Sequence, residues 1–390
     1  AKSDAPTMRD VLSAEKGEEA TTKGLQHLDP AFKALMAMEG TLGYNIDPRV
    51  RQLMSGVTTY QNLRLLWLAL FSSFGDPLGI VVRGGEMKDA WNAFTRGVRE
   101  VRLRWKNEHS TDDMAKLAEQ LGTVDAGSFL DALGQTYSSV FMYGKFKTIN
   151  DALFKWNGME AWNRAMRIQA TGAAVGFIKS HLTKPGEHSL RYMKDELGLD
   201  PAKKDKWLMK DGELDYSRDE VKTAIMRWVD GAILRPNAAQ RPVVASDPHY
   251  ALFYHLKQFV YSFHKTILKR AYVEAQHGNW SPAMALVAAY IPVMIAADLA
   301  KEMLLPDDDP PWMKQGLSGA VSHGFWRANL LGIPGMGVET YRRGDASSVL
   351  GPQIDQLADL ISVPFSERHT ALGEGFGALP GGSVWRRMAD

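Results

Sequence analysis

Few residues in this 390-residue chain have the types and spacing that enzyme chemistry requires. Ser262 and Lys265 form a Ser-x-x-Lys pattern, which could supply a nucleophile and its base, but they lie within an aromatic helical stripe where chance explains the match. The glycines between 373 and 377 follow no strand and do not predict a dinucleotide site. Phosphate-binding loops, zinc-protease motifs and nucleophile elbows are absent. We therefore expect no catalytic residues and no enzymatic activity.

Metal and cofactor sites are not indicated either. The chain contains no cysteine, which excludes disulfides, thiolate zinc sites and iron–sulfur clusters. His249 and His255 share a predicted helix at a spacing that does not align them on one face. Asp307, Asp308 and Asp309 could hold a cation, but a solvated cluster after a helix end is the simpler interpretation. We expect no bound metal and no cofactor.

The overall charge argues against a dedicated nucleic-acid-binding protein. Lys and Arg total 46 against 45 Asp and Glu, a formal net charge of +1, whereas such proteins are usually basic as a whole. The predicted helix Met87–Trp105 departs from this balance, because its polar side carries a basic face: Arg96, Arg99, Arg102 and Arg104. This basic face is either solvated, on a helix whose apolar stripe packs on the core, or suited to anionic lipid or nucleic acid.

Helical periodicity dominates the chain, as in Met87–Trp105, where apolar residues recur at spacings of four and three. A second long helical stretch is expected from Tyr137 to Phe177. Convincing strand alternation and hairpin signals are missing. The sequence therefore predicts an all-α fold: an elongated multi-helix bundle with long amphipathic helices, one membrane-inserting or interface helix and a loop-rich C-terminal tail.

Changes in composition divide the chain into four predicted parts. Residues 1–50 form an N-terminal arm or linker, and residues 51–245 form a helical domain. Residues 246–305 hold a pair of helices, one amphipathic and one apolar. Residues 306–390 form a Gly- and Pro-rich C-terminal tail, in which we expect one helix near Ile354 to Ile361.

The strongest anomaly is a stretch of twenty residues, 278–297, without any Asp, Glu, Lys or Arg. As a helix it would be about 30 Å long, the thickness of the hydrocarbon core of a bilayer. Pro292 would kink it and Asp298 lies close to its end, which favours a buried helix in an assembly instead. Membrane insertion and protein burial therefore both remain open for its large apolar residues: Trp280, Met284, Leu286, Val287, Tyr290, Ile291, Val293, Met294 and Ile295.

An aromatic amphipathic helix precedes this stretch, with its apolar stripe at Phe253, Leu256, Phe259, Val260, Phe263 and Ile267. An amphipathic helix followed by an uncharged one is typical of an interfacial-then-spanning hairpin, and equally of a bundle core. An earlier apolar run, Leu65–Gly75, is too short to span a bilayer and is expected to end at Asp76-Pro77 as a core or re-entrant helix.

Three segments of the chain form a recognisable set of landmarks. The early landmark is Tyr60–Leu63 followed by Phe71–Pro77, and the next is Trp156–Arg164. The most specific motif runs from Leu234 to Phe259 and includes Arg235, Pro236, Asn237, Arg241, Pro242, Asp247 and Pro248. Together these segments resemble bacteriophage internal virion proteins of the ejection type, which contain a large polyvalent protein-associated region. The arginines of the most specific motif could bind carboxylates or carbonyls of a neighbouring subunit, or DNA phosphates, or simply cap local helix ends.

The resemblance implies a protein packaged in the phage capsid, as the C-terminal part of a larger virion protein, that is ejected into the host periplasm and inner membrane. There it would form a homo-oligomeric conduit for genome delivery, with other ejection, portal or tail proteins, envelope lipids and transiently phage DNA as partners. Two alternatives remain: a non-membrane structural module packed against portal or core proteins, or a non-catalytic fragment of a virion peptidoglycan hydrolase or polymerase. The absence of cysteine suits a chain that reaches an oxidising compartment.

Overall fold

The computed structural model confirms the predicted all-α fold. It describes residues 32–33, 35–36, 47–66, 69–106, 108, 112–124, 144–234, 258–304, 316–327, 330 and 338. These residues are mostly helical and include no strand, apart from an isolated bridge between Leu208 and Leu214. The α-helices are α3 (Pro48–Leu65), α4 (Ala69–Ser72), α5 (Leu78–Val82), α6 (Met87–Trp105), α7 (Asp113–Gln120), α9 (Gly144–Trp156), α10 (Met159–Thr183), α11 (Glu187–Arg191), α12 (Asp219–Ala232), α13 (Gln258–Phe263), α14 (Lys269–Gln276), α15 (Ser281–Ala285), α16 (Ile291–Leu304) and α17 (Gly316–Arg327).

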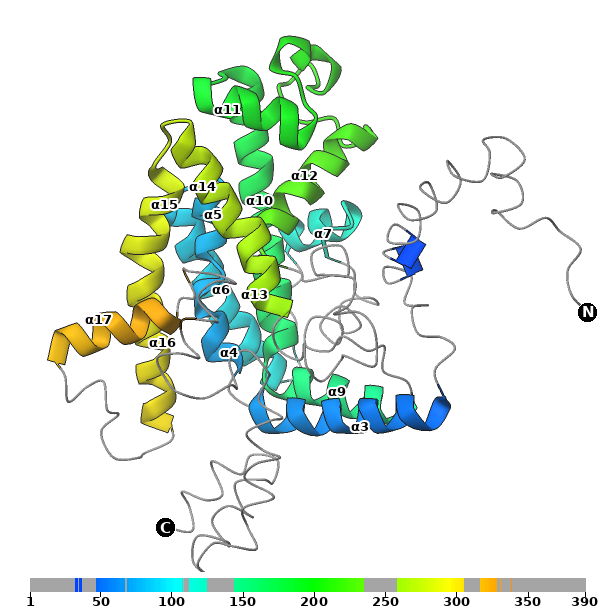
Figure 1. The fold of residues 1–390 in the computed structure, drawn as a ribbon. Helices are drawn as coiled ribbons and strands as arrows, with labels where there is room; N and C mark the ends of the chain where they lie inside the picture. Colours follow the sequence, from blue (N-terminus) through cyan, green and yellow to red (C-terminus); the bar gives the residue numbers. More distant parts are fainter. Residues whose placement is uncertain are drawn as a thin grey trace, which may run out of the picture.

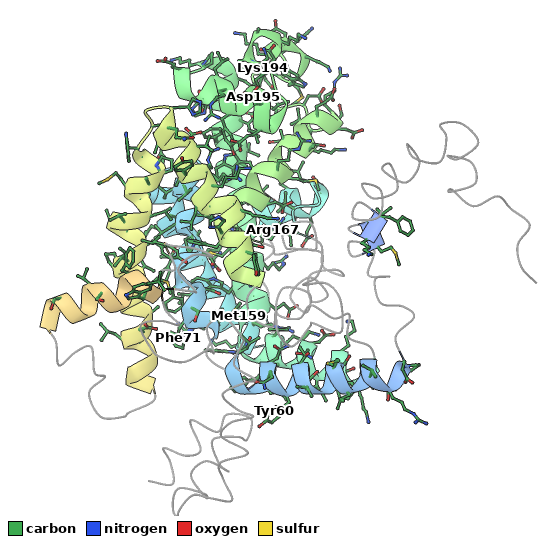
Figure 2. All side chains as sticks on the ribbon, viewed as in Figure 1. Tyr60, Phe71, Met159, Arg167, Lys194 and Asp195 are labelled. Carbon is green, nitrogen blue, oxygen red and sulfur yellow. The ribbon has the colours of Figure 1, made fainter. Side chains whose placement is uncertain are left out.

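Short 3₁₀ and π-helical segments connect several of these helices. The 3₁₀ segments are η1 (Ser73–Gly75) and η3 (Pro201–Lys206), and the π-helical segments are η2 (Tyr192–Leu197), η6 (His264–Leu268) and η7 (Leu286–Tyr290). In Figure 2, η2 with Lys194 and Asp195 lies at one end of the view and α3 with Tyr60 at the other. Figure 1 shows α15 and α16 continuing one another along one side, with α17 projecting from α16.

The main core forms around α10, which packs against α6, α7, α9 and α12. Trp162 on α10 and Trp228 on α12 are fully buried, and both belong to the largest apolar cluster. Arg167, one of the labelled residues on α10 in Figure 2, is buried and donates to Thr123 O at 2.6 Å and to Asp230 Oδ1 at 2.6 Å. Burial of large aromatic side chains supplies most of the stability of such a bundle.

The long helical stretch expected around Tyr137–Phe177 is interrupted where the structure describes it. α9 ends at Trp156 and α10 begins at Met159, because Gly158 adopts a left-handed conformation with φ 80°. Asn157 fills the gap between the helices: its side chain donates to Leu66 O at 3.0 Å and accepts from Met159 N at 3.0 Å. A residue with a Cβ would be strained at position 158, so glycine sets the break.

Helix α6 packs on the core through its small residues together with Val101 and Phe94 of its predicted apolar stripe. Ala90, Ala93 and Gly97 are buried. A Cβ on Gly97 would lie 2.7 Å from atoms of Trp162 and Met166, so the glycine allows α6 and α10 to approach closely. The other four large residues of the stripe lie on the adjacent side of α6 and are exposed to solvent: Met87, Trp91, Val98 and Trp105.

The second apolar cluster joins the helices after residue 258 to the early part of the chain. It combines Leu78 and Val82 of α5 with Phe263, Ile267 and residues of η7 and α16. Helix α17 lies within the segment predicted to be a loop-rich tail, and it packs on α16, where a Cβ on Gly324 would meet the Ile295 side chain at 2.4 Å. The helix expected near Ile354 to Ile361 lies outside the described residues, and the four-part division of the chain stays a prediction.

Candidate membrane-interaction site

One helix of the described chain is long and apolar enough to cross a bilayer. It runs from Ser281 to Ala300, 20 residues with a mean hydropathy of 1.9, and we call it the apolar helix. α15, η7 and the first part of α16 form it without interruption. Only 28% of its most apolar 18-residue window is buried inside the protein. A core helix of a soluble bundle would be covered on most of its surface, so the exposure of this helix distinguishes it from an ordinary core helix.

The exposed part is one continuous face that carries no charge. Trp280, Met284 and Val287 are 64%, 58% and 56% exposed, and the smaller residues Ala288, Pro292 and Ala296 continue the same side of the helix. We call these six residues the outer face. Trp280, Met284, Ala288, Pro292 and Ala296 recur every four residues, Val287 lies beside Ala288, and the six together extend along about 24 Å of helix. Exposed large apolar side chains in such a row are typical of a lipid or protein contact.

The opposite face of the apolar helix is part of the protein core. Leu286, Tyr290 and Met294 are buried, and they pack in the same cluster as Phe263 and Ile267 of the preceding helix. The rings of Phe263 and Tyr290 lie 5.5 Å apart, centroid to centroid. Two residues of the predicted amphipathic stripe are therefore core residues that hold the apolar helix from inside.

Proline shapes the apolar helix without ending it. Pro292 has no N–H to donate to the preceding turn and its ring would crowd that turn in a regular α-helix. The π-helical segment Leu286–Tyr290 lies immediately before it and changes the hydrogen-bond register there. A helix can therefore continue through Pro292 with the proline on the exposed side.

A buried polar network attaches the preceding helix to the early part of the chain. Arg270 of α14 donates to Val82 O at 3.2 Å and to Glu196 Oε1 at 3.0 Å, and its guanidinium lies 3.7 Å from the centre of the Tyr192 ring. Arg83 donates to the other oxygen of the same carboxylate at 3.0 Å. Burial lowers the pKa of Arg270, but arginine stays charged at any physiological pH. The network therefore fixes α14 and with it the start of the apolar helix.

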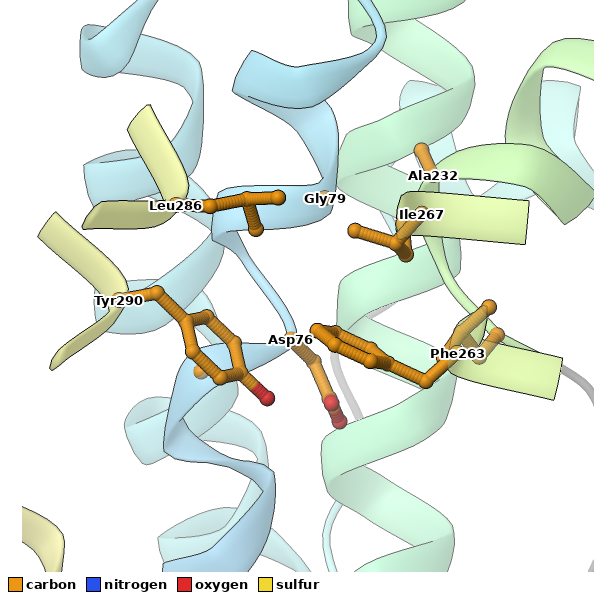
Figure 3. A pocket seen from close by; sticks show the side chains of 9 residues that line it. Asp76, Gly79, Ala232, Phe263, Ile267, Leu286 and Tyr290 are labelled. Atoms are coloured by element: carbon orange, nitrogen blue, oxygen red, sulfur yellow. The ribbon is translucent and has the colours of Figure 1, made fainter. Parts of the chain in front are cut away.

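A small cavity of about 20 Å³ lies between the apolar helix and the rest of the protein, large enough for about one water molecule. Asp76, Tyr290, Phe263 and Leu286 line it, and Figure 3 shows the Asp76 carboxyl and the Tyr290 hydroxyl directed into the same space. The Tyr290 ring can approach because residue 75 is glycine, where a Cβ would lie 2.5 Å from the ring. The remaining lining residues are Gly79, Ala232, Leu234 and Ile267.

Asp76 is the titratable group that the sequence interpretation missed. Burial of its carboxyl raises the pKa to about 7, although Trp162 and Ser73 lower it in part. The indole N–H of Trp162 has no partner in good hydrogen-bond geometry, so it compensates the buried charge only weakly. Asp76-Pro77 was expected to end a core or re-entrant helix, and no role was predicted for the carboxyl. In the structure the chain continues from η1 through this turn into α5, which brings the carboxyl inside.

The predicted basic face of α6 divides into two pairs. Arg96 forms an ion pair with Asp112 at 2.7 Å, and Arg104 forms one with Glu160 at 3.3 Å. These two arginines hold α6 to its neighbours. Arg99 and Arg102 are exposed, and Arg99 makes only a long ion pair with Glu100 at 3.9 Å, so of the four arginines these two remain accessible to an anionic ligand.

Part of the predicted site lies outside the described residues. This holds for Phe253, Leu256 and the whole family motif, Arg235, Pro236, Asn237, Arg241, Pro242, Asp247 and Pro248. Phe259 and Val260 lie on α13, but their side chains are not described. The described part of the chain contains no group of three or more His, Cys, Asp or Glu residues that could hold a metal ion.

Comparison with family models, curated proteins and solved structures finds no match to this chain. The proposed function therefore depends on the exposed surfaces of the protein and on the resemblance of its sequence motifs to ejection-type virion proteins.

Proposed function

We propose that the chain is a membrane-associating phage ejection protein, carried inside the virion and released into the host envelope. There it oligomerises into a conduit for the genome, together with other ejection, portal or tail proteins. It acts without a catalytic site or cofactor. The observation that carries the proposal is the outer face of the apolar helix, an uncharged exposed row on a helix of bilayer length.

The two faces of the apolar helix suit this role. Its inner face is held by core aromatics, so the helix is presented in a fixed orientation. Its outer face has Trp280 at one end, and tryptophan is enriched where a membrane meets water. The resemblance of residues 60–63, 71–77 and 156–164 to ejection-type virion proteins supports the host envelope as the place where the outer face contacts lipid.

A charge on the outer face should weaken membrane association through the apolar helix. In Met284→Glu, a carboxylate replaces an exposed apolar side chain, so folding is unaffected while insertion becomes costlier by about 2–3 kcal/mol. We expect the full chain to float with liposomes, and binding by the variant to be about 30- to 150-fold weaker. Flotation measures vesicle binding, and release of an entrapped dye measures formation of a conduit.

Met226→Glu is the matched control, because Met226 is 39% exposed on α12, away from the apolar helix. It should float like the unaltered chain. Equal flotation of Met284→Glu and the unaltered chain would refute insertion through the outer face, and so would failure of the unaltered chain to bind any vesicle.

A second candidate function is a structural module that packs against portal or core proteins inside the capsid. The burial of Leu286, Tyr290 and Met294 favours it, since this half of the apolar helix is already a protein interface. In that case another protein covers the outer face, and Met284→Glu would disrupt assembly of the virion protein while leaving liposome binding unchanged.

A further inference from the structure

Helix α6 presents a second exposed apolar row, far along the chain from the apolar helix. Met87, Trp91, Val98 and Trp105 are 52%, 64%, 49% and 64% exposed. Their spacing of four, seven and seven residues places them on one side of the helix, over about 27 Å. We call them the tryptophan ridge. Surface tryptophans normally find a partner, so two of them in one exposed row mark a contact surface.

The core holds the tryptophan ridge in place. The Trp91 ring stacks on Phe94 at 5.8 Å, and Phe94 in turn packs edge-on against the buried Trp162 at 5.7 Å. The Trp105 indole donates to Trp156 O at 3.2 Å, and the Trp156 side chain is itself exposed. The ridge is therefore a preformed surface, continued onto α9, and its ordering costs little on binding.

A row of cations lies directly beside the ridge. Lys88, Arg99, Arg102 and Lys106 are all exposed, and their spacing of eleven, three and four residues places them on the adjacent side of α6. Among the described residues, no carboxylate forms an ion pair with Lys88, Arg102 or Lys106. We call these four residues the cation row.

We propose that α6 docks on an anionic bilayer surface, with the tryptophan ridge in the interface and the cation row on lipid phosphates. A helix with aromatic and aliphatic residues on one side and lysines and arginines on the next matches the chemistry of that interface. This surface is separate from the outer face, so the inference goes beyond the proposed function and stands without it.

Two other occupants fit the surface less well. Nucleic acid would use the cation row, but Met87 and Val98 offer nothing to phosphates or bases and would stay exposed. A protein partner would cover the ridge, but lysine is depleted from protein–protein interfaces, and the row contains two. An anionic lipid surface uses both rows at once.

The test compares binding of the full chain to neutral phosphatidylcholine vesicles and to vesicles with about one-third phosphatidylglycerol. We expect tighter binding to the anionic vesicles, lost in part at high salt. In Arg102→Gln with Lys106→Gln, binding to the anionic vesicles should fall about 10-fold or more, since each cation near such a surface contributes on the order of 1 kcal/mol. Binding to neutral vesicles should not change.

The control is Lys203→Gln with Lys204→Gln, which removes two exposed lysines of η3. It should bind the anionic vesicles like the unaltered chain. Equal loss in the control and the α6 variant would overturn the proposal, since it would show a dependence on net charge alone. Loss of single-stranded DNA binding with unchanged vesicle binding would overturn it in favour of nucleic acid.

The experiment distinguishes the outer face of the apolar helix from the α6 surface, because each variant alters only one of them. Loss of binding in Met284→Glu alone supports insertion of the apolar helix and overturns α6 docking. Loss of the anionic preference in the α6 variant alone supports α6 docking, whatever the apolar helix does. Val98→Glu tests the tryptophan ridge itself and should weaken binding to anionic vesicles at high salt, where the cations contribute least.

Discussion

Replacing Asp76 by asparagine should make the protein more stable at neutral and alkaline pH. In the folded state the pKa of Asp76 is raised to about 7 from an ordinary 3.8, so the folded chain holds a proton that the unfolded chain has released. Stability is therefore lost as pH rises from about 4 to 7. At about 1.4 kcal/mol per pH unit, the loss reaches up to about 4 kcal/mol. Asparagine fills the same space and carries no charge, so the variant avoids this loss.

Urea unfolding at pH 4 to 8 measures the effect as the difference in free energy of unfolding between Asp76→Asn and the unaltered chain. The difference should grow in favour of the variant as pH rises and level off above pH 7. Asp195→Asn, at an exposed position of η2, is the control and should run parallel to the unaltered chain. A constant difference across the range would show that the Asp76 carboxyl is solvated.

Gly79→Ala should be among the most destabilising single substitutions in the described part of the chain. A Cβ at this position would lie 1.8 Å from the carbonyl oxygen of Ala232, which is backbone and cannot rotate away. Helices α5 and α12 would have to separate, and both line the cavity at Asp76. Overpacking against rigid backbone costs about 3 kcal/mol or more.

Gly176→Ala should have the opposite effect and raise the free energy of unfolding. Gly176 lies inside α10, is exposed, and has no atom near the position of an added Cβ. Alanine should stabilise the helix there by about 0.5–1 kcal/mol. If both variants unfold at the same urea concentration as the unaltered chain, the close approach of α5 to α12 is not present in solution.

Local signals in the sequence predicted much of the secondary structure. The all-α class followed from periodicity. Asp112 and Asp200 accept backbone N–H groups at the starts of α7 and η3, as aspartate commonly does at the N-cap of a helix. The uncharged stretch from residue 278 forms the helix that composition predicted. Ser217 comes just before α12 and has the residue type of a cap, but its hydroxyl donates to Asp215 and Arg218 occupies the cap position, because a local turn competes for the same side chain.

Packing partners could not be predicted in the same way. The large apolar stripe of α6 was expected to face the core, but only Phe94 and Val101 do so. The contact with α10 is made largely by Ala90, Ala93 and Gly97, since small residues allow a close approach. Their recurrence at spacings of three and four was a usable signal. Asp76 carried no local sign of burial, because its surroundings come from η7 and α10, far along the chain.

The central claim is that the outer face of the apolar helix contacts lipid. Because the chain has no cysteine, Val287→Cys gives a single site for an environment-sensitive fluorophore, with Met226→Cys as the matched exposed position on α12. With vesicles, we expect a blue shift at position 287 and quenching by lipids labelled deep in the acyl chains, and neither at position 226. A fluorophore at position 287 that remains in water when vesicles are present would contradict the account.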